Sequence, residues 1–173
     1  LRGQNSTADF FLDGLRDDAQ YYRPLYNTER VEVLKGANAM IFGRGGGGGV
    51  VNRVSKVPDF ANPVRAGSAS LDSFGAWTLA ADLGQPLSDQ AALRFNATRE
   101  QLNNHRDGFK GHFTGTDLTL ALRPGEDTRI ALSYEFGDDD RVTDRGIPSR
   151  AGQPLRGYDR TFFGKRGVNQ SDV

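Results

Sequence analysis

The sequence contains no cysteine and only two histidines, His105 and His112, among its 173 residues. The absence of cysteine excludes disulfides, thiolate metal sites and a cysteine nucleophile. Both histidines lie in one polar stretch, so a histidine-based metal cluster is not expected. No spacing indicates a nucleophile with its base or a pair of catalytic carboxylates. The prediction is a protein that is not an enzyme, with no metal site and no cofactor.

The chain also lacks an excess of charge and a long hydrophobic run. Lys and Arg number 22 against 22 Asp and Glu, so the composition gives no reason to expect nucleic-acid binding. No stretch reaches the roughly 18 apolar residues of a membrane helix, which excludes a helical span but leaves β-strand spans open. The chain begins at Leu1 without a visible leader, and we therefore expect a fragment of a longer protein.

After Pro63 the sequence alternates apolar and polar residues with period two, which predicts strands. A first strand is expected at Val64 to Leu71, and four more follow. These four cover residues 77–83, 93–98, 117–123 and 129–136. Their lengths approach the roughly 9–11 residues of a tilted strand that crosses a bilayer. A soluble antiparallel sandwich alternates in the same way and stays open as an alternative.

The connections between these expected strands alternate in character. A tight turn at 72–75 and a longer polar loop at 103–112 fall at one end, together with the charged stretch after Phe136. The stretches 84–90 and 124–128 fall at the other end. Outer-membrane barrels have short periplasmic turns and longer external loops, so 84–90 and 124–128 are predicted to be periplasmic. Five strands do not close a barrel, which takes about eight.

Before Pro58 the most unusual feature is the glycine run GRGGGGGVVNRVSK, Gly43 to Lys56. It matches G-x-G-x-x-G, but it opens a β-branched segment instead of a helix and lacks Gly-Lys-Ser/Thr, which disfavours a phosphate loop. The interpretation is a tight backbone passage between two strands, formed by Gly43, Gly45, Gly46, Gly47, Gly48 and Gly49. Arg44 within it needs an anionic partner, for which Glu32 and the barrel wall are candidates.

Short elements are expected around this passage. Phe10 to Leu12 is followed by Asp13-Gly14, a turn pair typical of hairpins. The segment 30–35 predicts a half-buried strand in which Val31 and Val33 lie opposite Glu32. Residues 49–56 predict another strand, and 37–42 is expected to be one helical turn or an extended piece.

Several of these segments together resemble a known family, the TonB-dependent outer-membrane receptors. Thr28 to Pro58 is similar to the C-terminal part of the family's plug, with its ERVEVLKGP strand, GRG…GG loop and VIN-x-V-(S/T)-K strand. LRG (1–3) and FFLDGLRDDAQYYR (10–23) resemble upstream plug segments. DRGIPSRAGQPL (144–155) and TFFG (161–164) are similar to an external loop of ferric-siderophore receptors. One departure is Ala37, where the family usually has proline.

The resemblance implies a mainly β fold. A small mixed α/β plug segment is followed by antiparallel strands of a transmembrane β-barrel, which has about 22 strands in the intact family member. It assigns residues 1–58 to the C-terminal part of the plug, 59–63 to a linker, and 64–173 to about the first five barrel strands with their external loops. The expected location is the outer membrane of a Gram-negative bacterium.

The function that the resemblance implies is high-affinity uptake of a ferric siderophore, with the ligand bound at plug apices and external loops. The implied partners are this ligand, outer-membrane lipid, and TonB of the inner-membrane energising complex, which contacts a segment upstream of this chain. A receptor of the same family for cobalamin, haem, nickel or a carbohydrate is an alternative. A soluble β-rich binding domain, sugar-binding or adhesive, is the alternative outside the family.

The resemblance also implies roles for individual residues. The outward-facing plug apices, which are expected to bind the siderophore through aromatic stacking and charge-assisted hydrogen bonds, comprise Gln4, Asn5, Tyr21, Tyr22 and Arg23. Packing of the plug against the wall is the alternative role for the two tyrosines. The expected ionic network between plug and barrel comprises Arg2, Glu32, Lys35 and Arg44. An exposed strand charge is the alternative for Glu32.

Overall fold

The computed structural model describes residues 9–19, 21–36, 39, 42, 49–165, 168 and 170–172. The chain divides into two compact units, 1–58 and 59–173, and each has its own main sheet. Strands account for the regular structure, and no α-helix occurs among the described residues. The predicted mainly β fold is therefore confirmed. The helical turn considered at 37–42 lies largely outside the described residues.

No helix in the described part of the chain is long and apolar enough to cross a membrane.

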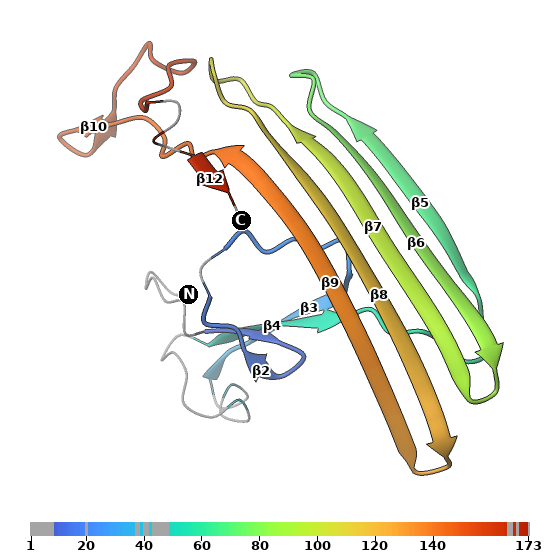
Figure 1. The fold of residues 1–173 in the computed structure, drawn as a ribbon. Coiled ribbons are helices and arrows are strands. Elements are labelled where there is room, and N and C mark those ends of the chain that lie inside the picture. Colours follow the sequence, from blue (N-terminus) through green and yellow to red (C-terminus); the bar gives the residue numbers. More distant parts are fainter. Residues whose placement is uncertain are drawn as a thin grey trace. The chain divides into compact units, whose positions relative to one another are not determined.

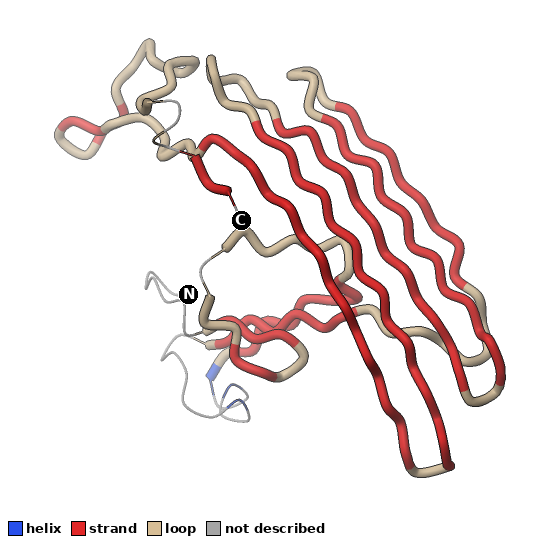
Figure 2. The backbone as a smooth tube through the Cα atoms, in the orientation of Figure 1, coloured by secondary structure: helices blue, strands red, loops and turns tan. Residues whose placement is uncertain are grey.

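The first unit contains a four-stranded mixed sheet with the order β2-β1-β4-β3 (Figures 1 and 2). Its strands are β1 (Phe10–Leu12), β2 (Leu15–Arg16), β3 (Thr28–Leu34) and β4 (Val50–Ser55). β4 lies centrally and pairs parallel with β1 and antiparallel with β3. The strands expected at 30–35 and 49–56 are both present, although β3 begins two residues earlier than expected. The parallel pairing with β1 had no signal in the sequence.

The predicted hairpin at Asp13-Gly14 is confirmed. Leu12 pairs with Leu15, and the two residues between them have φ values of 51° and 82°. Positive φ at both central positions defines the type I′ turn, which Asp-Gly pairs favour. The Asp13 carboxylate also accepts a hydrogen bond of 2.8 Å from the backbone N–H of Ser55, so the turn is fastened to the end of β4.

The predicted burial of β3 is wrong. Val31 and Val33 are 45% and 52% exposed, whereas Glu32 between them is half-buried. The reason lies in the register of the sheet, because Glu32 stands directly opposite Asn52 of β4 and accepts a 2.9 Å hydrogen bond from its amide. Alternation identified the strand correctly, but a polar pair rather than the valines occupies its more buried face.

The second unit contains a six-stranded antiparallel sheet with the order β12-β9-β8-β7-β6-β5 (Figure 1). Its strands are β5 (Val64–Leu71), β6 (Trp77–Ser88), β7 (Ala91–Leu102), β8 (Gly111–Gly125), β9 (Thr128–Val142) and β12 (Gln170–Asp172). All five predicted strands are present, and β5 has the predicted bounds. The sixth strand, β12, was missed. A small hairpin of β10 (Ser149–Arg150) and β11 (Gln153–Pro154) lies in the connection between β9 and β12.

Two predicted connections are shorter than expected, because the strands continue through them. Residues 84–88 belong to β6, which leaves only Asp89 and Gln90 as the turn, and β8 reaches Gly125. Proline inside a strand was the misleading signal. Pro86 lies beyond the end of β5, which pairs no further than Gly84, so its missing N–H leaves no β5 carbonyl without a donor. Likewise β9 continues past Phe136 to Val142.

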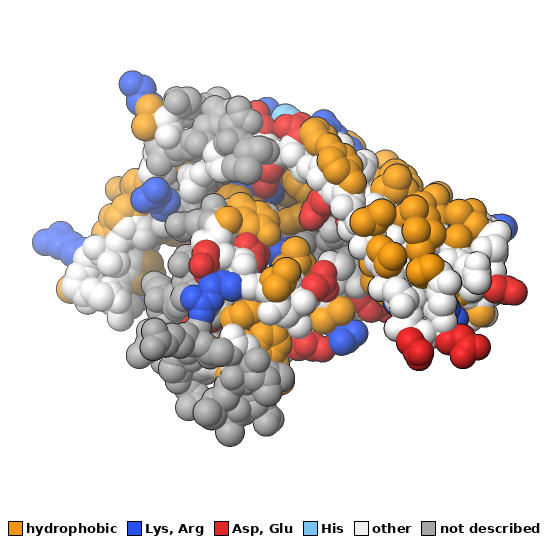
Figure 3. Space-filling model, turned by 60° about the horizontal axis from the view of Figure 1, so that its bottom comes forward, with side chains coloured by type: hydrophobic (Ala, Val, Ile, Leu, Met, Phe, Trp, Pro, Cys, Tyr) orange, Lys and Arg blue, Asp and Glu red, His pale blue; other side chains and the backbone are white. Residues whose placement is uncertain are grey.

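The two faces of the large sheet differ in polarity, in the opposite sense to the faces of a soluble sheet. One face buries polar or charged side chains, namely Asn96, Thr98, Asp117, Thr119 and Asp139. The opposite face exposes large apolar side chains, namely Leu71, Leu79, Leu83, Leu118, Ile130, Leu132, Tyr134 and Phe136. Figure 3 shows hydrophobic side chains gathered in a broad patch on the right of the view. A soluble sheet has the opposite arrangement, whereas a membrane barrel has apolar residues outside and polar residues inside.

The segment expected to be a linker, 59–63, has structure of its own. Two guanidinium groups of the large sheet contact the Phe60 ring, Arg123 at 4.4 Å and Arg129 at 5.3 Å from its centroid. Asp59 accepts hydrogen bonds from the Ala61 backbone and the Asn62 side chain, which lower the pKa of its carboxyl group. Its role as a linker between domains stays a prediction.

Candidate functional site

Three of the five predicted ligand residues are described. Tyr21, Tyr22 and Arg23 lie in the segment between β2 and β3, whereas Gln4 and Asn5 lie outside the described residues. Tyr22 is 47% exposed, and Tyr21 and Arg23 are half-buried. These three residues therefore do not share one environment, and the contacts of Tyr21 and Arg23 set them apart.

Tyr21 and Arg23 belong to a polar cluster centred on Asp17. One carboxylate oxygen of Asp17 accepts hydrogen bonds of 2.9 Å from the Tyr21 hydroxyl, from Arg23 Nε and from Arg53 Nη2. Arg53 Nη2 also donates to the Tyr21 hydroxyl at 2.7 Å. The Arg23 guanidinium lies 4.4 Å from the centroid of the Phe10 ring and 4.8 Å from that of Tyr21. We call Asp17, Tyr21, Arg23 and Arg53 the Asp17 cluster.

The Asp17 cluster is largely removed from solvent. The side chains of Asp17, Arg23 and Arg53 are 11%, 15% and 8% exposed. Burial alone would raise the pKa of Asp17, but hydrogen bonds from Arg23 and Tyr21 and the two nearby positive charges outweigh it and lower that pKa. Burial raises the pKa of Tyr21, and its hydrogen bond to Asp17 adds to the rise. Both residues therefore keep their ordinary charge states at neutral pH.

This arrangement assigns internal contacts to two predicted ligand residues. Asp17 and Arg53 were missed by the sequence reasoning, although an arginine inside the β-branched segment Val50 to Val54 was an available signal. Arg53 lies on central strand β4, so the cluster ties the segment after β2 to the middle of the sheet. Siderophore contact by Tyr21, Tyr22 and Arg23 stays a prediction.

The predicted plug–barrel ionic network is described only at Glu32 and Lys35, because Arg2 and Arg44 lie outside the described residues. Glu32 accepts hydrogen bonds from Asn52 at 2.9 Å and from Arg30 at 2.8 Å, which lower the pKa of its carboxyl group. The other side of the Asn52 amide accepts a 3.0 Å bond from the N–H of Gly14. Lys35 is exposed immediately after β3. These contacts of Glu32 lie within its own unit.

Of the six glycines assigned to the tight backbone passage, only Gly49 is described. Gly49 is buried and has a φ of 123°, a conformation that side-chain-bearing residues rarely adopt. A Cβ atom there would lie 2.5 Å from the carbonyl oxygen of Leu34. Both constraints apply where β4 begins beside the end of β3. Gly43, Gly45, Gly46, Gly47 and Gly48 lie outside the described residues.

The buried face of the large sheet carries a separate polar set. Arg94 of β7 makes two hydrogen bonds, of 2.9 and 2.8 Å, to the Asp82 carboxylate of β6. Asp117 accepts from the hydroxyl groups of Thr119 and Ser133 at 3.2 and 3.0 Å. Asn96 stands between Asp82 and Asp117 in register and is completely buried. Polar pairs and hydroxyls thus line this face, as the interior of a membrane barrel requires.

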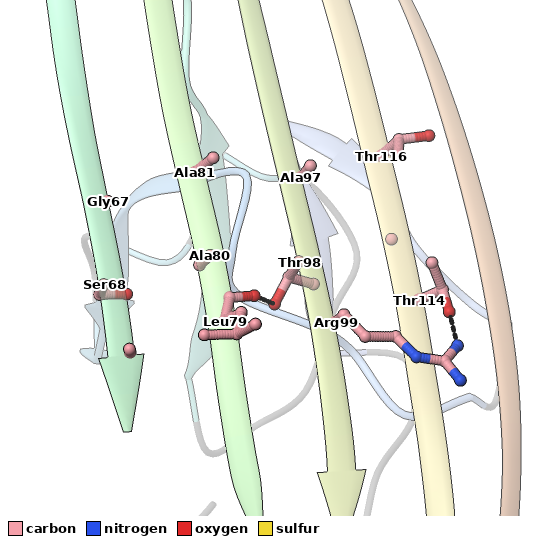
Figure 4. Close-up of a pocket in the computed structure, with 12 residues that line it drawn as sticks. Gly67, Ser68, Leu79, Ala80, Ala81, Ala97, Thr98, Arg99, Thr114 and Thr116 are labelled. Carbon is pink, nitrogen blue, oxygen red and sulfur yellow. Dashed lines mark hydrogen bonds between the residues drawn. The ribbon is translucent and has the colours of Figure 1, made fainter. Parts of the chain in front are cut away.

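The opposite face carries a shallow hollow of about 650 Å³. Leu79, Arg99 and Thr114 point to the same side of the sheet around it, and Arg99 donates to the Thr114 hydroxyl (Figure 4). A row of small residues, Gly67, Ala81, Ala97 and Thr116, leaves the hollow open. Because it lies on the exposed apolar face, we assign it to the lipid-facing surface and not to a ligand site.

No group of three or more His, Asp or Glu side chains among the described residues could hold a metal ion. The second unit has long strands with a buried polar face and an exposed apolar face, as in the wall of a membrane barrel. The first unit has a small mixed sheet with a buried polar cluster and is plug-like. Comparison with known proteins identifies the class. Residues 1–50 match the TonB-dependent receptor plug domain. Together with the relatives described next, this match shows that the chain belongs to the TonB-dependent receptors of the Gram-negative outer membrane, which are receptors and not enzymes.

Particular relatives are similar along most of the chain. The probable TonB-dependent receptor BfrD of Bordetella pertussis is 34% identical over 90% of this chain and 21% of its own length. The catecholate siderophore receptor Fiu of Escherichia coli K12 is 32% identical over 99% of this chain and 22% of its own length. The open-form crystal structure of Fiu superposes with a TM-score of 0.78 at 31% identity, over 85% of this chain and 22% of that one.

A second solved structure agrees with this assignment. The siderophore receptor PiuA of Acinetobacter baumannii superposes with a TM-score of 0.83 at 26% identity, over 94% of this chain and 24% of that one. The chain spans about a fifth of the length of the curated relatives it matches. The predicted family, the outer-membrane location and the barrel-type fold are confirmed. The soluble β-rich domain considered as an alternative is thereby excluded.

Proposed function

We propose that this chain is part of a TonB-dependent receptor that takes up a ferric siderophore across the outer membrane. The single observation that carries the proposal is the inverted large sheet, whose buried polar face and exposed apolar face suit a barrel wall. Such a wall, which follows a plug-domain sequence along the chain, fits a gated transporter. Transport of this kind needs ligand binding and conformational change but no bond-making chemistry.

The siderophore as ligand is supported by the relatives. Fiu is named a catecholate siderophore receptor, and PiuA is named a siderophore receptor. Both likenesses extend beyond the plug into the strands and loops after Pro58, because they cover 99% and 94% of this chain. Loops that contact ligand diverge fastest between receptors of different specificity, so a likeness that includes them favours a related ligand class.

Within the plug unit, Tyr22 is the strongest candidate for ligand contact. Tyr22 is 47% exposed, whereas Tyr21 and Arg23 are half-buried. We therefore propose that Tyr22 touches the chelate directly and that the Asp17 cluster holds the segment that presents it. Replacing Tyr22 by alanine is expected to weaken ferric-chelate binding about threefold to tenfold, the worth of one aromatic contact.

A matched variant separates contact from support. Tyr21→Phe keeps the ring but removes the hydroxyl that bonds to Asp17 and Arg53. This change is expected to lower the stability of the plug unit while leaving chelate affinity within about twofold. Equal loss of affinity in Tyr21→Phe and Tyr22→Ala would contradict the division of roles between these neighbours.

Two further partners belong to this proposal. TonB supplies the energy through a segment outside this chain, and lipid covers the exposed apolar face of the large sheet. No resident cofactor is proposed, because the iron chelate is the transported ligand.

The experiment that tests the function is growth on defined iron sources. Cells that lack the gene are compared with the parent on ferric catecholates, ferric hydroxamates, haem, and media supplemented with cobalamin. Loss of growth on one ferric siderophore, restored by the gene on a plasmid, is the expected result. A defect confined to haem or cobalamin would reassign the ligand, and unimpaired growth on every source would contradict the proposal.

A further inference from the structure

Three connections of the large sheet meet at one end and enclose a small cavity. They are the turn between β5 and β6, the loop between β7 and β8, and the connection between β9 and β12 (Figure 1). The cavity has a volume of about 340 Å³ and is lined by Phe74, Asn104, His105, Asp107 and Arg160. It lies entirely within the second unit, and His105 is the one lining residue that was considered above, as a candidate metal ligand. We call it the loop cavity.

One wall of the loop cavity is an exposed aromatic ring on a rigid turn. Phe74 is 51% exposed, although its backbone is fixed on both sides. The Asp72 carboxylate accepts bonds of 2.8 and 2.9 Å from the N–H groups of Phe74 and Ala76, and Asn103 donates to the Phe74 carbonyl at 2.9 Å. The Phe74 ring lies 6.2 Å from the His105 ring, centroid to centroid, at an angle of 60°. A phenyl ring that is exposed to water on a fixed turn is suited to stacking against a ligand.

Arg106 lies between the lining residues His105 and Asp107 in the sequence and holds both limbs of the long connection. Its guanidinium pairs with Asp144 at 2.5 Å at the start of the connection and donates to the Thr161 carbonyl at 3.2 Å near its end. The Arg106 and Asp144 side chains are only 10% and 15% exposed, so this pair is largely shielded from water. The backbone of Asp107 adds a 2.8 Å bond to the carbonyl of Arg160. The cavity is therefore preorganised rather than a chance gap between loose loops.

The lining of the loop cavity also includes a cation that can change partner. Arg160 pairs with Asp107 at 3.1 Å, but the two side chains are 77% and 71% exposed. An exposed pair of this kind is weak, because water and salt screen it. An anionic group in the cavity can therefore replace Asp107 as the partner of the Arg160 guanidinium with little loss of free energy. Arg106 keeps its shielded partner, Asp144.

The surrounding charge favours an anion over a cation. Residues 72–76, 103–110 and 143–165 together contain seven Lys and Arg against four Asp, a net charge of +3 in a chain whose total is zero. A field of this sign attracts anions toward the mouth of the cavity before they touch any residue. A cationic ligand would find Phe74 and Asp107 favourable but would have to overcome the excess of positive charge.

We propose that the loop cavity is a binding site for an aromatic ring that carries anionic oxygens, with Phe74 stacking on the ring and Arg160 pairing with the oxygens. The proposal rests on the proposed siderophore function, because an aryl group with deprotonated hydroxyls is one way to chelate ferric iron. It adds an outer contact to the one assigned to Tyr22 and gives the receptor a preference for aromatic over aliphatic chelates.

The test uses the intact receptor in detergent and two probes, the ferric complexes of 2,3-dihydroxybenzoate and of acetohydroxamate. Dissociation constants are measured by quenching of tryptophan fluorescence. Phe74→Ala is expected to weaken binding of the aromatic probe about tenfold and of the aliphatic probe less than twofold, since only the first stacks. Arg160→Gln is expected to weaken binding of the anionic complex of the aromatic probe severalfold, in proportion to the charge it removes.

Matched controls come from the same connection. Tyr158→Ala removes an exposed ring that packs on Phe163 at 5.7 Å and does not line the cavity, and Arg150→Gln removes a charge from β10. Both are expected to change affinity for either probe less than twofold. Phe74→Leu keeps apolar volume but no ring, and it should reproduce the loss of Phe74→Ala if that loss reflects stacking and not misfolding.

The outcomes separate this site from the receptor function. If Phe74→Ala and Phe74→Leu bind the aromatic probe as the parent does, the loop cavity is not a ligand site, while siderophore uptake stands on the growth assay. If both probes lose affinity equally in Phe74→Ala, the claim of aromatic selectivity is overturned. If the parent receptor binds neither probe, the cavity proposal fails as well, whatever the growth assay gives.

Discussion

The plug-like unit and the barrel-like sheet differ in how they use polar side chains. In the first unit the strands are two to seven residues long, and a charged cluster of four side chains ties them to the intervening segments. In the second unit β8 and β9 are 15 residues long, and an almost unbroken backbone ladder joins them. There the polar side chains line one face and leave the other to apolar residues.

This difference follows from the surroundings of each unit. Strands exposed to lipid must satisfy every backbone N–H and C=O within the sheet, which demands long ladders and an apolar outer face. A plug surrounded by protein and water has no such requirement, so short strands suffice if specific side chains hold them. Under the proposed transport function, we expect the plug-like unit to be the one that moves, because its structure depends on a few side-chain hydrogen bonds.

The largest expected effect of mutation is at the centre of the Asp17 cluster. Arg53→Met removes two hydrogen bonds to Asp17 and Tyr21 and leaves a buried carboxylate with one cation fewer. Breaking a buried pair in this way costs about 3–5 kcal/mol. Hydrogen exchange of peptides from residues 10–58 in the intact receptor measures it, with Arg16→Met as the exposed control. Unchanged protection in Arg53→Met would refute the assigned role of the cluster.

The next effect is expected on the apolar face of the large sheet. Leu132→Arg places a charge among exposed apolar residues of β9 and should destabilise the inserted barrel by about 2–4 kcal/mol if it lies near the bilayer midplane. Ala131→Arg, one residue earlier, points to the opposite face and should cost less than about 1 kcal/mol. Equilibrium unfolding of the receptor in lipid bilayers measures both. Equal costs would mean that the faces are assigned wrongly.

A smaller effect is expected at the junction between the units. Phe60→Leu removes a ring that contacts both Arg123 and Arg129, and exposed cation–π contacts are worth about 0.5–1 kcal/mol each. Proteolysis within residues 57–63 should become faster by a corresponding factor of about fivefold to thirtyfold, with Phe163→Leu as a control ring in another loop. An unchanged cleavage rate would show that Phe60 does not anchor this segment.

The smallest expected effect is a loss of stability in acid, which does not appear at neutral pH. The folded-state pKa of Asp17 is lowered, so its stabilising contribution is complete above the ordinary value of 3.8 and is lost as the pH falls through the lower folded value. The stability difference between the parent and Asp17→Asn, followed by hydrogen exchange from pH 6 to pH 3, should therefore be constant at first and shrink below about pH 4. A difference that grows on acidification would contradict the assigned direction of the shift.

The sequence predicted the large sheet better than the plug-like unit, for a physical reason. Period-two alternation over 12 to 15 residues is a repeated signal, and it located β5 to β9 although it missed the extent of β6 through Pro86. β12 escaped because its three residues carry no alternation. The burial of β3 was wrong because Glu32 is held by Asn52, a partner 20 residues away.

The predicted site shows the same limit. Family resemblance directed attention to Tyr21, Tyr22 and Arg23, but the residues that hold them, Asp17 and Arg53, are brought together by parallel pairing of β1 with β4. No local pattern encodes that pairing. The loop cavity was also beyond prediction, because it combines three loops that are distant in sequence.

The most direct test of the whole account is uptake of iron-55 by intact cells. The ferric siderophore identified by the growth assay is supplied to four strains, with and without this gene, each in the presence or absence of functional TonB. We predict saturable uptake only in the strain that has both. Undiminished uptake without the gene, or gene-dependent uptake that persists without TonB, would contradict the account.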